Sequence, residues 1–326
     1  MEKINWGIIG CGDVTEIKSG PAFNKVPNSV LQAVMRRNAE KVKDYAIRHN
    51  VPRYYTDANE LLADPLINAI YIATPPDSHE SYAIAALEAG KAVYVEKPMT
   101  LNRSSARRMV DAAAKTKGKL VVAHYRRAQP IYLKIKELLD GEVIGKLLYA
   151  KLDYRRKPAT DAELADPKTA WRYDPAISGG GLFHDLAPHQ LDLAYYFFGI
   201  IKDAHGVSSN RSRLYPADDL VTGNILFESG VQFSGSWCFT AAPEQEEDAC
   251  EIFGTEGSIR FSVFNQQKIL LTTNSGQGVF HFAALQHVQQ PMIEKVVSYF
   301  LDEGPNPCTA EDGYAVMEVM DAFTGK

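Results

Sequence analysis

The sequence has few cysteines and no long apolar run. Its four cysteines, Cys11, Cys238, Cys250 and Cys308, lie far apart and have neither metal-binding nor disulfide spacing. No stretch approaches the roughly 18 consecutive apolar residues that a membrane span needs. No apolar signal core follows Met1. We therefore expect a cytoplasmic protein with reduced thiols and no membrane partner.

The chain also lacks an excess of charge of either sign. Its formal net charge is -5 in 326 residues, with 23% charged and 45% hydrophobic residues. These proportions are typical of a globular protein. They give no reason to expect nucleic acid or an anionic membrane as a partner. The length exceeds that of one ordinary core, so two domains are expected.

Short apolar runs alternate with amphipathic stretches over the first 123 residues. The predicted strands, apolar almost throughout, are Ile4–Ile9, Val30–Met35, Ala69–Ala73, Ala92–Val95 and Leu120–Ala123. The predicted helices between them are Ala39–His49, Asn59–Ala63, Ser78–Ala89 and Ser104–Lys117. Such alternation predicts an α/β domain at residues 1–123, a doubly wound parallel sheet of the Rossmann type.

The pattern changes after residue 123 to strands with period-two alternation. After one helix, Ile131–Leu139, the predicted strands are Leu147–Arg155, Asp203–Ser208, Val221–Phe227, Val231–Phe239, Cys250–Phe253, Ser258–Val263 and Lys268–Thr273. Hairpin signatures lie at 227–231 and 254–257, and two helices, Gln286–Leu301 and Ala310–Phe323, close the chain. Residues 124–326 are therefore predicted to form an open, mostly antiparallel sheet domain with flanking helices.

A glycine turn, Gly10-Cys11-Gly12, follows the first predicted strand directly and opens a helix. Such glycines permit a tight turn and let the main chain approach a pyrophosphate at the helix N-terminus. Gly10, Gly12, Asp13 and Val14 are therefore predicted to bind a dinucleotide. Thr15 replaces the third glycine of the usual fingerprint. An ordinary glycine turn is the alternative.

Two arginines, Arg36 and Arg37, stand at the end of the second strand, where an acidic residue normally holds the ribose 2′-hydroxyl. Guanidinium groups there could pair with a 2′-phosphate and stack on the adenine. The sequence therefore favours NADP as cofactor, with NAD as the alternative. Arginines that are merely solvated at a strand end are the competing interpretation.

A rigid turn, Thr74-Pro75-Pro76, follows the strand at 69–73. Because ligands of open α/β sheets bind outside the carboxyl ends of the strands, we expect these three residues to border the nicotinamide. His79 follows them at a predicted helix start and is included among the candidate cofactor contacts. A capping or surface histidine is the more ordinary interpretation of that position.

The segment from Ser178 to Asp192 runs from three glycines into a predicted helix. Asp185 and His189 are four residues apart there, which places both side chains on one helix face. A histidine suits proton transfer near neutrality, and a carboxylate can orient its imidazole. The alternative is a metal site made of His184, Asp185, His189 and Asp192. We disfavour it, because His184 points about 100° away from Asp185 and no further ligand cluster is evident.

Four motifs occur in the order and spacing of one known family. They are Gly10-Cys11-Gly12, Thr74-Pro75-Pro76, Glu96-Lys97-Pro98 and the glycine-rich segment Gly179–His189. In these motifs the chain resembles the Gfo/Idh/MocA oxidoreductases, which include glucose–fructose oxidoreductase and inositol dehydrogenase. The resemblance covers essentially the whole chain. It implies a Rossmann domain, a second domain with an open sheet, and a substrate between that sheet and the nicotinamide.

The resemblance also assigns roles to individual residues. By motif, Lys97, Asp185 and His189 are the catalytic residues, and Pro98 matches a position that is often cis in the family. Lys97 would hydrogen-bond the reacting oxygen and stabilise the charge that develops there. The same three residues are therefore expected to touch the substrate.

Further contacts are expected around this centre. Glu96 and Lys97 are candidate cofactor contacts, and Trp171-Arg172 resembles a family segment that reaches cofactor or substrate from the second domain. The remaining candidate substrate contacts are Tyr125, Arg126 and Tyr154. For each of these three, an exposed basic strand end is the alternative.

The sequence thus predicts an NADP-dependent oxidoreductase that acts on a small sugar, sugar derivative or polyol and uses no metal. One alternative is a dihydrodiol dehydrogenase-like enzyme or an imine or carbonyl reductase on the same scaffold. Another is an NADP-sensing binding protein without turnover, which would not need the three catalytic residues. The uncovered face of the second sheet predicts a homodimer or homotetramer.

Overall fold

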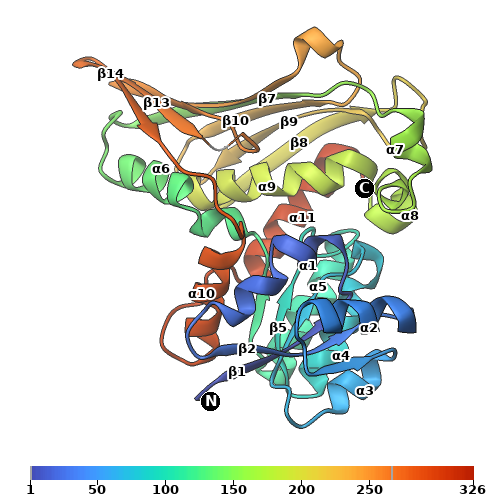
Figure 1. The fold of residues 1–326 in the computed structure, drawn as a ribbon. Helices are drawn as coiled ribbons and strands as arrows, with labels where there is room; N and C mark the ends of the chain where they lie inside the picture. The colour runs from blue at the N-terminus through green and yellow to red at the C-terminus, as the bar shows by residue number, and fades with distance from the viewer. Residues whose placement is uncertain (1, 266) are drawn as a thin grey trace. The chain divides into compact units, whose positions relative to one another are not determined.

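The computed structural model describes residues 2–265 and 267–326. Met1, where the first predicted domain begins, lies outside the described residues. The chain forms two compact units, each with its own β-sheet (Figure 1). Unit 1 comprises Met1–Ala128 and Leu285–Tyr314, and unit 2 comprises Gln129–Ala284 and Ala315–Lys326. The predicted division between residues 123 and 124 stays a prediction.

Unit 1 contains a parallel sheet of six strands in the order β3-β2-β1-β4-β5-β6. The parallel pairing confirms the predicted doubly wound sheet. Its edge strand β3 was not predicted. The strands are β1 (Ile4–Ile9), β2 (Ser29–Met35), β3 (Arg53–Tyr55), β4 (Ala69–Ile72), β5 (Ala92–Val95) and β6 (Leu120–Val122).

Helices pack against this sheet and bury most of its side chains outside the edge strand β3, as its apolar strands require. Trp6 in β1 contacts Phe23 and Phe300, with ring centroids 4.7 and 5.6 Å away. Phe300 belongs to a helix that follows unit 2 in the chain but packs within unit 1. The helices are α1 (Asp13–Ile17), η1 (Gly20–Asn24), α2 (Ala39–Arg48), α3 (Ala58–Ala63), η2 (Pro76–Ser78), α4 (His79–Glu88), α5 (Arg103–Thr116), η3 (Tyr125–Ala128) and α10 (Gln290–Phe300).

Unit 2 contains a sheet of eight strands in the order β14-β13-β12-β11-β7-β10-β9-β8. Only β7 and β10 pair in parallel, so the mostly antiparallel prediction is confirmed. Both predicted hairpins are present, and Gly230 takes a positive φ of 85° in the first. The strands are β7 (Leu147–Arg155), β8 (Ile201–Ser209), β9 (Leu220–Phe227), β10 (Gln232–Cys238), β11 (Glu247–Gly254), β12 (Gly257–Phe261), β13 (Lys268–Thr273) and β14 (Gly276–His281).

One face of this sheet is covered by helices (Figure 1). Gly206 and Gly223 leave room for the Phe323 ring of α11, and Trp237 Nε1 donates to Gln190 Oε1 of α9 at 2.6 Å. The opposite face presents exposed side chains, including Tyr149 and Val207. The helices are α6 (Pro130–Asp140), α7 (Asp161–Ala165), η4 (Ala170–Tyr173), α8 (Pro175–Ser178), α9 (Gly181–Phe198), η5 (Pro243–Gln245) and α11 (Ala310–Thr324), whose residues from Ala315 belong to unit 2.

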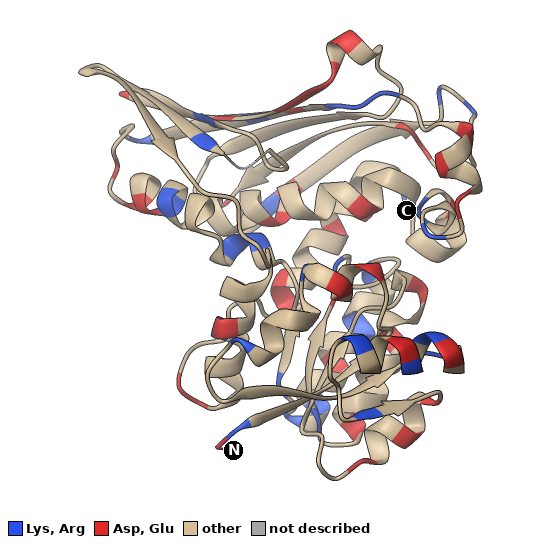
Figure 2. Ribbon diagram, viewed as in Figure 1, with Lys and Arg blue, Asp and Glu red and all other residues tan. Residues whose placement is uncertain are grey.

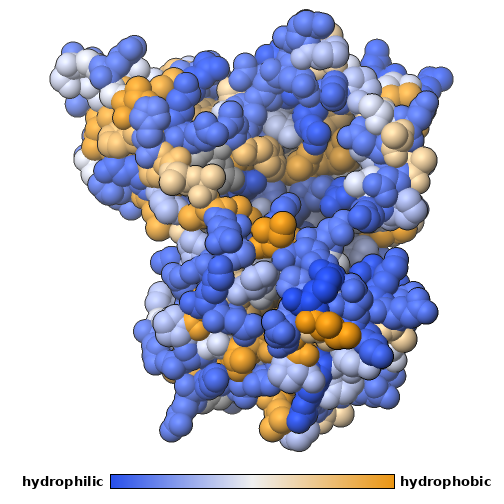
Figure 3. Space-filling view, in the orientation of Figure 1, coloured by the Kyte–Doolittle hydropathy of each residue, from blue (hydrophilic) through white to orange (hydrophobic). Residues whose placement is uncertain are grey.

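Charged residues of both signs are interspersed over the helices and strand ends (Figure 2). The face seen in Figure 3 is mostly hydrophilic, with small hydrophobic patches between polar residues. Among the described residues, no helix has the length and apolar character required to cross a membrane.

Candidate functional site

The glycine turn lies at the carboxyl end of β1, next to β4, where the strand order of unit 1 reverses. Gly10 has a φ of 91°, and a Cβ there would lie 2.6 Å from the Thr74 methyl group. A Cβ on Gly12 would meet nothing closer than 3.9 Å. Thr15 is buried and donates to the Gly12 carbonyl at 2.8 Å. The turn is therefore tight on one side and open on the other, as main-chain approach to a phosphate requires.

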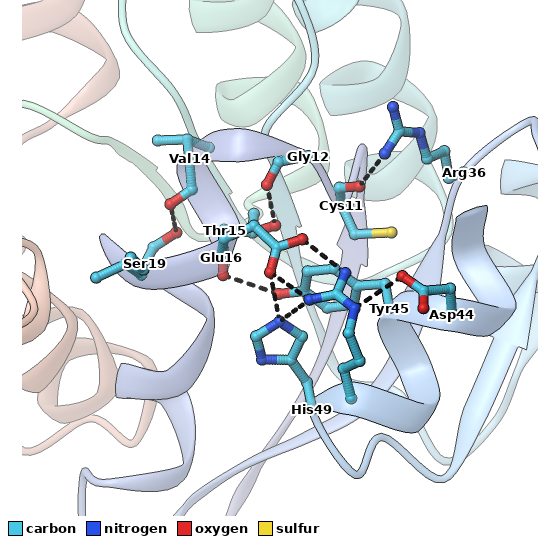
Figure 4. A network of polar contacts seen from close by, with 12 residues as sticks. Cys11, Gly12, Val14, Thr15, Glu16, Ser19, Arg36, Asp44, Tyr45 and His49 are labelled. Carbon is cyan, nitrogen blue, oxygen red and sulfur yellow. Dashed lines mark hydrogen bonds and ion pairs between the residues drawn. The ribbon is translucent and has the colours of Figure 1, made fainter.

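Arg36 lies across this turn (Figure 4). Its Nη1 donates to the Cys11 carbonyl oxygen at 3.2 Å, and the side chain is half-buried. A merely solvated strand end is therefore wrong for Arg36, whereas Arg37 is exposed. Burial raises the pKa of the Cys11 thiol to about 12, against the opposing charge of Arg36. Cys11 therefore remains a protonated packing residue.

Ion pairs connect α1, which follows the turn, to α2 (Figure 4). The Glu16 carboxylate accepts from Arg48 at 2.8 and 2.9 Å and lies 2.8 Å from His49 Nε2. The hydrogen bond from Arg48 is the main reason why the pKa of Glu16 falls to about 2. Tyr45 adds a hydrogen bond from its hydroxyl to the Thr15 carbonyl at 2.8 Å. These contacts fix the helix that the glycine turn opens.

His79 is fully buried between two strand-end loops. Its Nδ1 lies 2.9 Å from the Pro98 carbonyl and its Nε2 lies 2.8 Å from the Thr74 carbonyl. Both the surface and the capping interpretations are therefore wrong, since the N-cap of α4 is Ser78. Burial lowers the pKa of His79, while the two carbonyls oppose this. His79 thus connects the loop after β4 to the loop after β5.

The segment Glu96-Lys97-Pro98 follows β5 at the same carboxyl edge of the sheet. Glu96 is buried, and its carboxylate accepts the Tyr71 hydroxyl at 2.5 Å and Gln289 Nε2 at 2.6 Å on one oxygen. The other oxygen accepts the Lys97 main-chain amide at 3.1 Å. Lys97 itself is half-buried, and the Lys97–Pro98 peptide bond is cis, as the resemblance implied.

The residues after β6 are buried rather than exposed. Tyr125, Arg126 and Arg127 each expose 7% or less, so the exposed basic strand end is wrong here. Arg127 pairs with Asp312 at 2.8 Å, and the Arg126 guanidinium lies 5.6 Å from the centre of the Tyr125 ring. The ion pair of Arg127 with Asp312 therefore connects the segment after β6 to the first turn of α11.

Helix α9 of unit 2 carries Asp185 and His189, which confirms that the two lie one helical turn apart. His189 is buried with its ring 5.8 Å from that of Phe264, and Asp185 is partly exposed. Arg172 of η4 donates from Nε to Asp185 Oδ2 at 3.1 Å. Its guanidinium also lies 4.8 Å from the Trp171 ring centre. Of the predicted pair Trp171-Arg172, Arg172 therefore contacts Asp185.

Local packing explains the three glycines before α9. Gly179 and Gly181 have φ of 91° and 74°, which favour glycine. Gly180 lies under the His184 ring, and a Cβ there would collide with it. Burial and the charge of Lys326 lower the pKa of His184 to about 3. His184 is therefore a neutral packing residue.

Tyr154 lies on the covered face of β7. It is buried, so an exposed strand end is wrong for this residue too. Burial raises its pKa to about 12, and Arg156 acts in the opposite direction. Within residues 2–265 and 267–326, no three His, Cys, Asp or Glu side chains are grouped to hold a metal ion.

Sequence reasoning missed three partners of the candidate residues. Tyr71 and Gln289 bind Glu96, and Arg172 was expected at the cofactor or substrate rather than on Asp185. A tyrosine in a buried strand next to an acidic strand end was a usable signal for Tyr71. Nothing near Gln289 in the sequence points to Glu96.

Comparison with known proteins gives the same assignment for both units. Residues 4–124 match the model "Oxidoreductase family, NAD-binding Rossmann fold", and residues 132–260 match "GFO/IDH/MocA C-terminal domain". "Oxidoreductase P35" of Formosa agariphila is 49% identical over 99% of both chains. "Scyllo-inositol 2-dehydrogenase (NAD(+))" of Bacillus subtilis is 27% identical, over 84% of this chain and 78% of that one. The fold is similar to "Levoglucosan dehydrogenase, complex with NADH" (TM-score 0.89, 24% identity, 98% and 96% coverage).

Proposed function

The chain belongs to the Gfo/Idh/MocA family of oxidoreductases with an NAD-binding Rossmann domain, and from that premise we propose an NADP-dependent enzyme acting on a sugar, sugar derivative or polyol. The main support for this proposal is the position of Lys97. It follows β5 at the carboxyl edge of the sheet, the same edge at which the glycine turn follows β1. A substrate of this class is in keeping with the similarity to the scyllo-inositol 2-dehydrogenase of Bacillus subtilis.

In the proposed mechanism, Lys97, Asp185 and His189 each have a separate role. His189 takes the hydroxyl proton of the alcohol in oxidation and returns it in reduction. Asp185, one helical turn away and paired with Arg172, orients that imidazole and stabilises its charged form. Lys97 donates to the reacting oxygen and stabilises the charge that develops there. The bound nicotinamide supplies the other half of the chemistry, since it accepts or gives the hydride.

The cofactor fits the residues around the glycine turn. Gly12 leaves open space where a pyrophosphate needs to approach the main chain. At the same carboxyl edge of the sheet lie the glycine turn, Thr74-Pro75-Pro76 and His79. Arg36 stands at the end of β2 with its guanidinium already held at the turn. We favour NADP because a guanidinium there pairs with a 2′-phosphate, whereas NAD offers a hydroxyl.

Self-association through the uncovered sheet face of unit 2 is part of the proposal. That face carries a Tyr149–Phe253 stack with ring centroids 4.5 Å apart, and Val207, which is 71% exposed. Apolar side chains on an uncovered face of an eight-stranded sheet suit an isologous contact between two copies of this chain. We expect a homodimer or homotetramer.

Substitution of Lys97 tests the catalytic assignment. Lys97→Ala removes the donor to the reacting oxygen, and kcat is expected to fall about 100- to 1000-fold, the usual effect of losing such a donor. NADPH affinity, measured by fluorescence titration, should change much less. Lys115→Ala, an exposed lysine on α5, is the matched control and should behave as wild type. Unchanged turnover in Lys97→Ala would remove Lys97 from the mechanism.

A further inference from the structure

The candidate catalytic lysine is held by a buried carboxylate with several donors. Glu96 exposes only 6% of its surface, and its two oxygens accept from Tyr71, Gln289 and the Lys97 amide. A buried carboxylate needs such donors, because water cannot replace them. The two donors on Oε1 fix the plane of the carboxylate, and that plane fixes the direction in which Oε2 holds Lys97.

Gln289 donates to Glu96 from the segment just before α10, whereas Tyr71 lies in β4 and Lys97 follows β5. It is fully buried just before α10, and its own amide nitrogen donates to the Lys18 carbonyl at 3.2 Å. Its side-chain oxygen accepts the Tyr94 hydroxyl at 3.2 Å, while Nε2 faces Glu96 at 2.6 Å. This orientation of the amide is required, because a carboxylate accepts hydrogen bonds and cannot donate them. Burial and the charge of Glu96 raise the pKa of Tyr94 and of Tyr71, so both phenols remain donors.

A second anchor lies on the other side of Lys97. The Pro98 carbonyl is 2.9 Å from His79 Nδ1. The lysine main chain is therefore bracketed by Glu96 before it and His79 after it. Its side chain extends from a segment that has little freedom to move.

We infer that Gln289, through Glu96, is a positioning residue for Lys97. The inference rests on the proposed function, in which Lys97 touches the reacting oxygen. A misplacement of about 1 Å in such a group can cost 100-fold in rate. The position of Lys97 therefore depends on Gln289, which lies 193 residues from Glu96 in the chain.

The first test compares Gln289→Ala with Gln290→Ala. Gln290 is the next residue, and its side chain donates to the exposed Glu294 of α10 at 3.2 Å and not to Glu96, so it is a matched control. Gln289→Ala should lower kcat about 10- to 100-fold while NADPH affinity changes less than about threefold. In the absence of any substrate, hydrogen exchange of the Lys97 amide should become at least about tenfold faster, because its acceptor is loosened. Gln290→Ala should match wild type in all three.

Gln289→Glu gives a readout that simple destabilisation would not. Two buried carboxyl groups then face each other and share one proton at low pH, which restores a donor to Glu96. The kcat of this variant should rise as the pH falls, in a step that wild type and Gln289→Ala lack. If Gln289→Ala does not fold, Tyr71→Phe removes one donor from the same carboxylate oxygen and keeps the ring.

The outcomes separate the two levels of the account. Turnover lost in Lys97→Ala but normal in both Gln289→Ala and Tyr71→Phe would overturn the inference and leave the proposed function standing. Turnover normal in Lys97→Ala would overturn the proposed function itself. The inference would also be overturned if Gln290→Ala lowered kcat as much as Gln289→Ala does. The same holds if Gln289→Ala lowered kcat while hydrogen exchange of the Lys97 amide stayed unchanged.

Discussion

Two buried polar side chains, Glu96 and His79, fix the main chain around Lys97. Glu96 and His79 use both of their polar atoms on neighbouring groups inside unit 1. Lys97 lies between them and is only half-buried. Glu96 and His79 therefore restrict the main chain on either side of Lys97, the residue that we propose contacts the substrate.

His184 predicts an acid-sensitive stability. Its pKa is about 3 in the folded chain, below the ordinary 6.5, mainly because of burial. At a pH between these two pKa values, His184 is protonated in the unfolded chain and neutral in the folded chain. The free energy of unfolding should therefore fall as the pH drops through this window, by up to about 1.4 kcal/mol per pH unit from this group. Urea unfolding of His184→Phe, in which nothing titrates, should give a flatter profile, and equal slopes would contradict this.

The candidate site could be predicted from the sequence where a local motif carries it. Gly10-Cys11-Gly12, Lys97 and the pair Asp185 and His189 stand at the strand end or on the helix that their spacing indicated. The contacts of Glu96 with Gln289 and of Asp185 with Arg172 could not be predicted. They depend on which side chains the folded chain brings together, and one sequence contains no signal for that.

At the scale of elements, the ion pair between Glu16 and Arg48 is one of the contacts that connect α1 to α2. The pKa of Glu16 lies at about 2, below the ordinary 4.5, chiefly because of its hydrogen bond with Arg48. The stability that this carboxylate contributes is therefore present above pH 4.5 and is lost as the pH falls toward 2. Because Glu16 is about one-third exposed, its loss in Glu16→Gln should cost below about 1 kcal/mol. Thermal melts at neutral pH and at high salt should show a small difference that salt reduces, and a large salt-independent loss would contradict it.

The two strands that the sequence prediction missed, β3 and β14, are both edge strands, although the other two edge strands, β6 and β8, were predicted. β1, β5, β7 and β13 have the bounds that their apolar or alternating patterns indicated. β3 is a three-residue edge strand with mostly exposed side chains, and β14 is an exposed edge strand with two glycines. An edge strand needs no continuous apolar pattern, so periodicity does not reveal short, exposed ones such as β3 and β14.

At the scale of the whole molecule, the chain crosses from unit 2 back to unit 1 with Leu285–Tyr314. This return places α10 against the Rossmann sheet and Gln289 against Glu96. Local sequence pattern assigns α10 its helix but not its unit, because the decision depends on long-range packing.

The whole molecule is expected to associate with further copies of itself through the uncovered sheet face of unit 2. Light scattering should give two or four times the chain mass of 36.1 kDa. Val207→Glu places a charge on the uncovered sheet face and should lower that mass, since burying an unpaired charge is costly. Ile47→Glu, on the exposed side of α2 in unit 1, is the control and should not. A wild-type mass equal to one chain over a wide concentration range would contradict self-association.

The proposed function is tested most directly by following nicotinamide absorbance with the purified protein and a panel of aldoses, polyols and inositols, with NADP and NAD in parallel. We predict turnover with at least one class of these compounds and a higher kcat/KM for NADP than for NAD. A preference for NAD would contradict the role given to Arg36. No turnover with any compound and either cofactor, while NADPH binds tightly, would contradict the proposed enzyme.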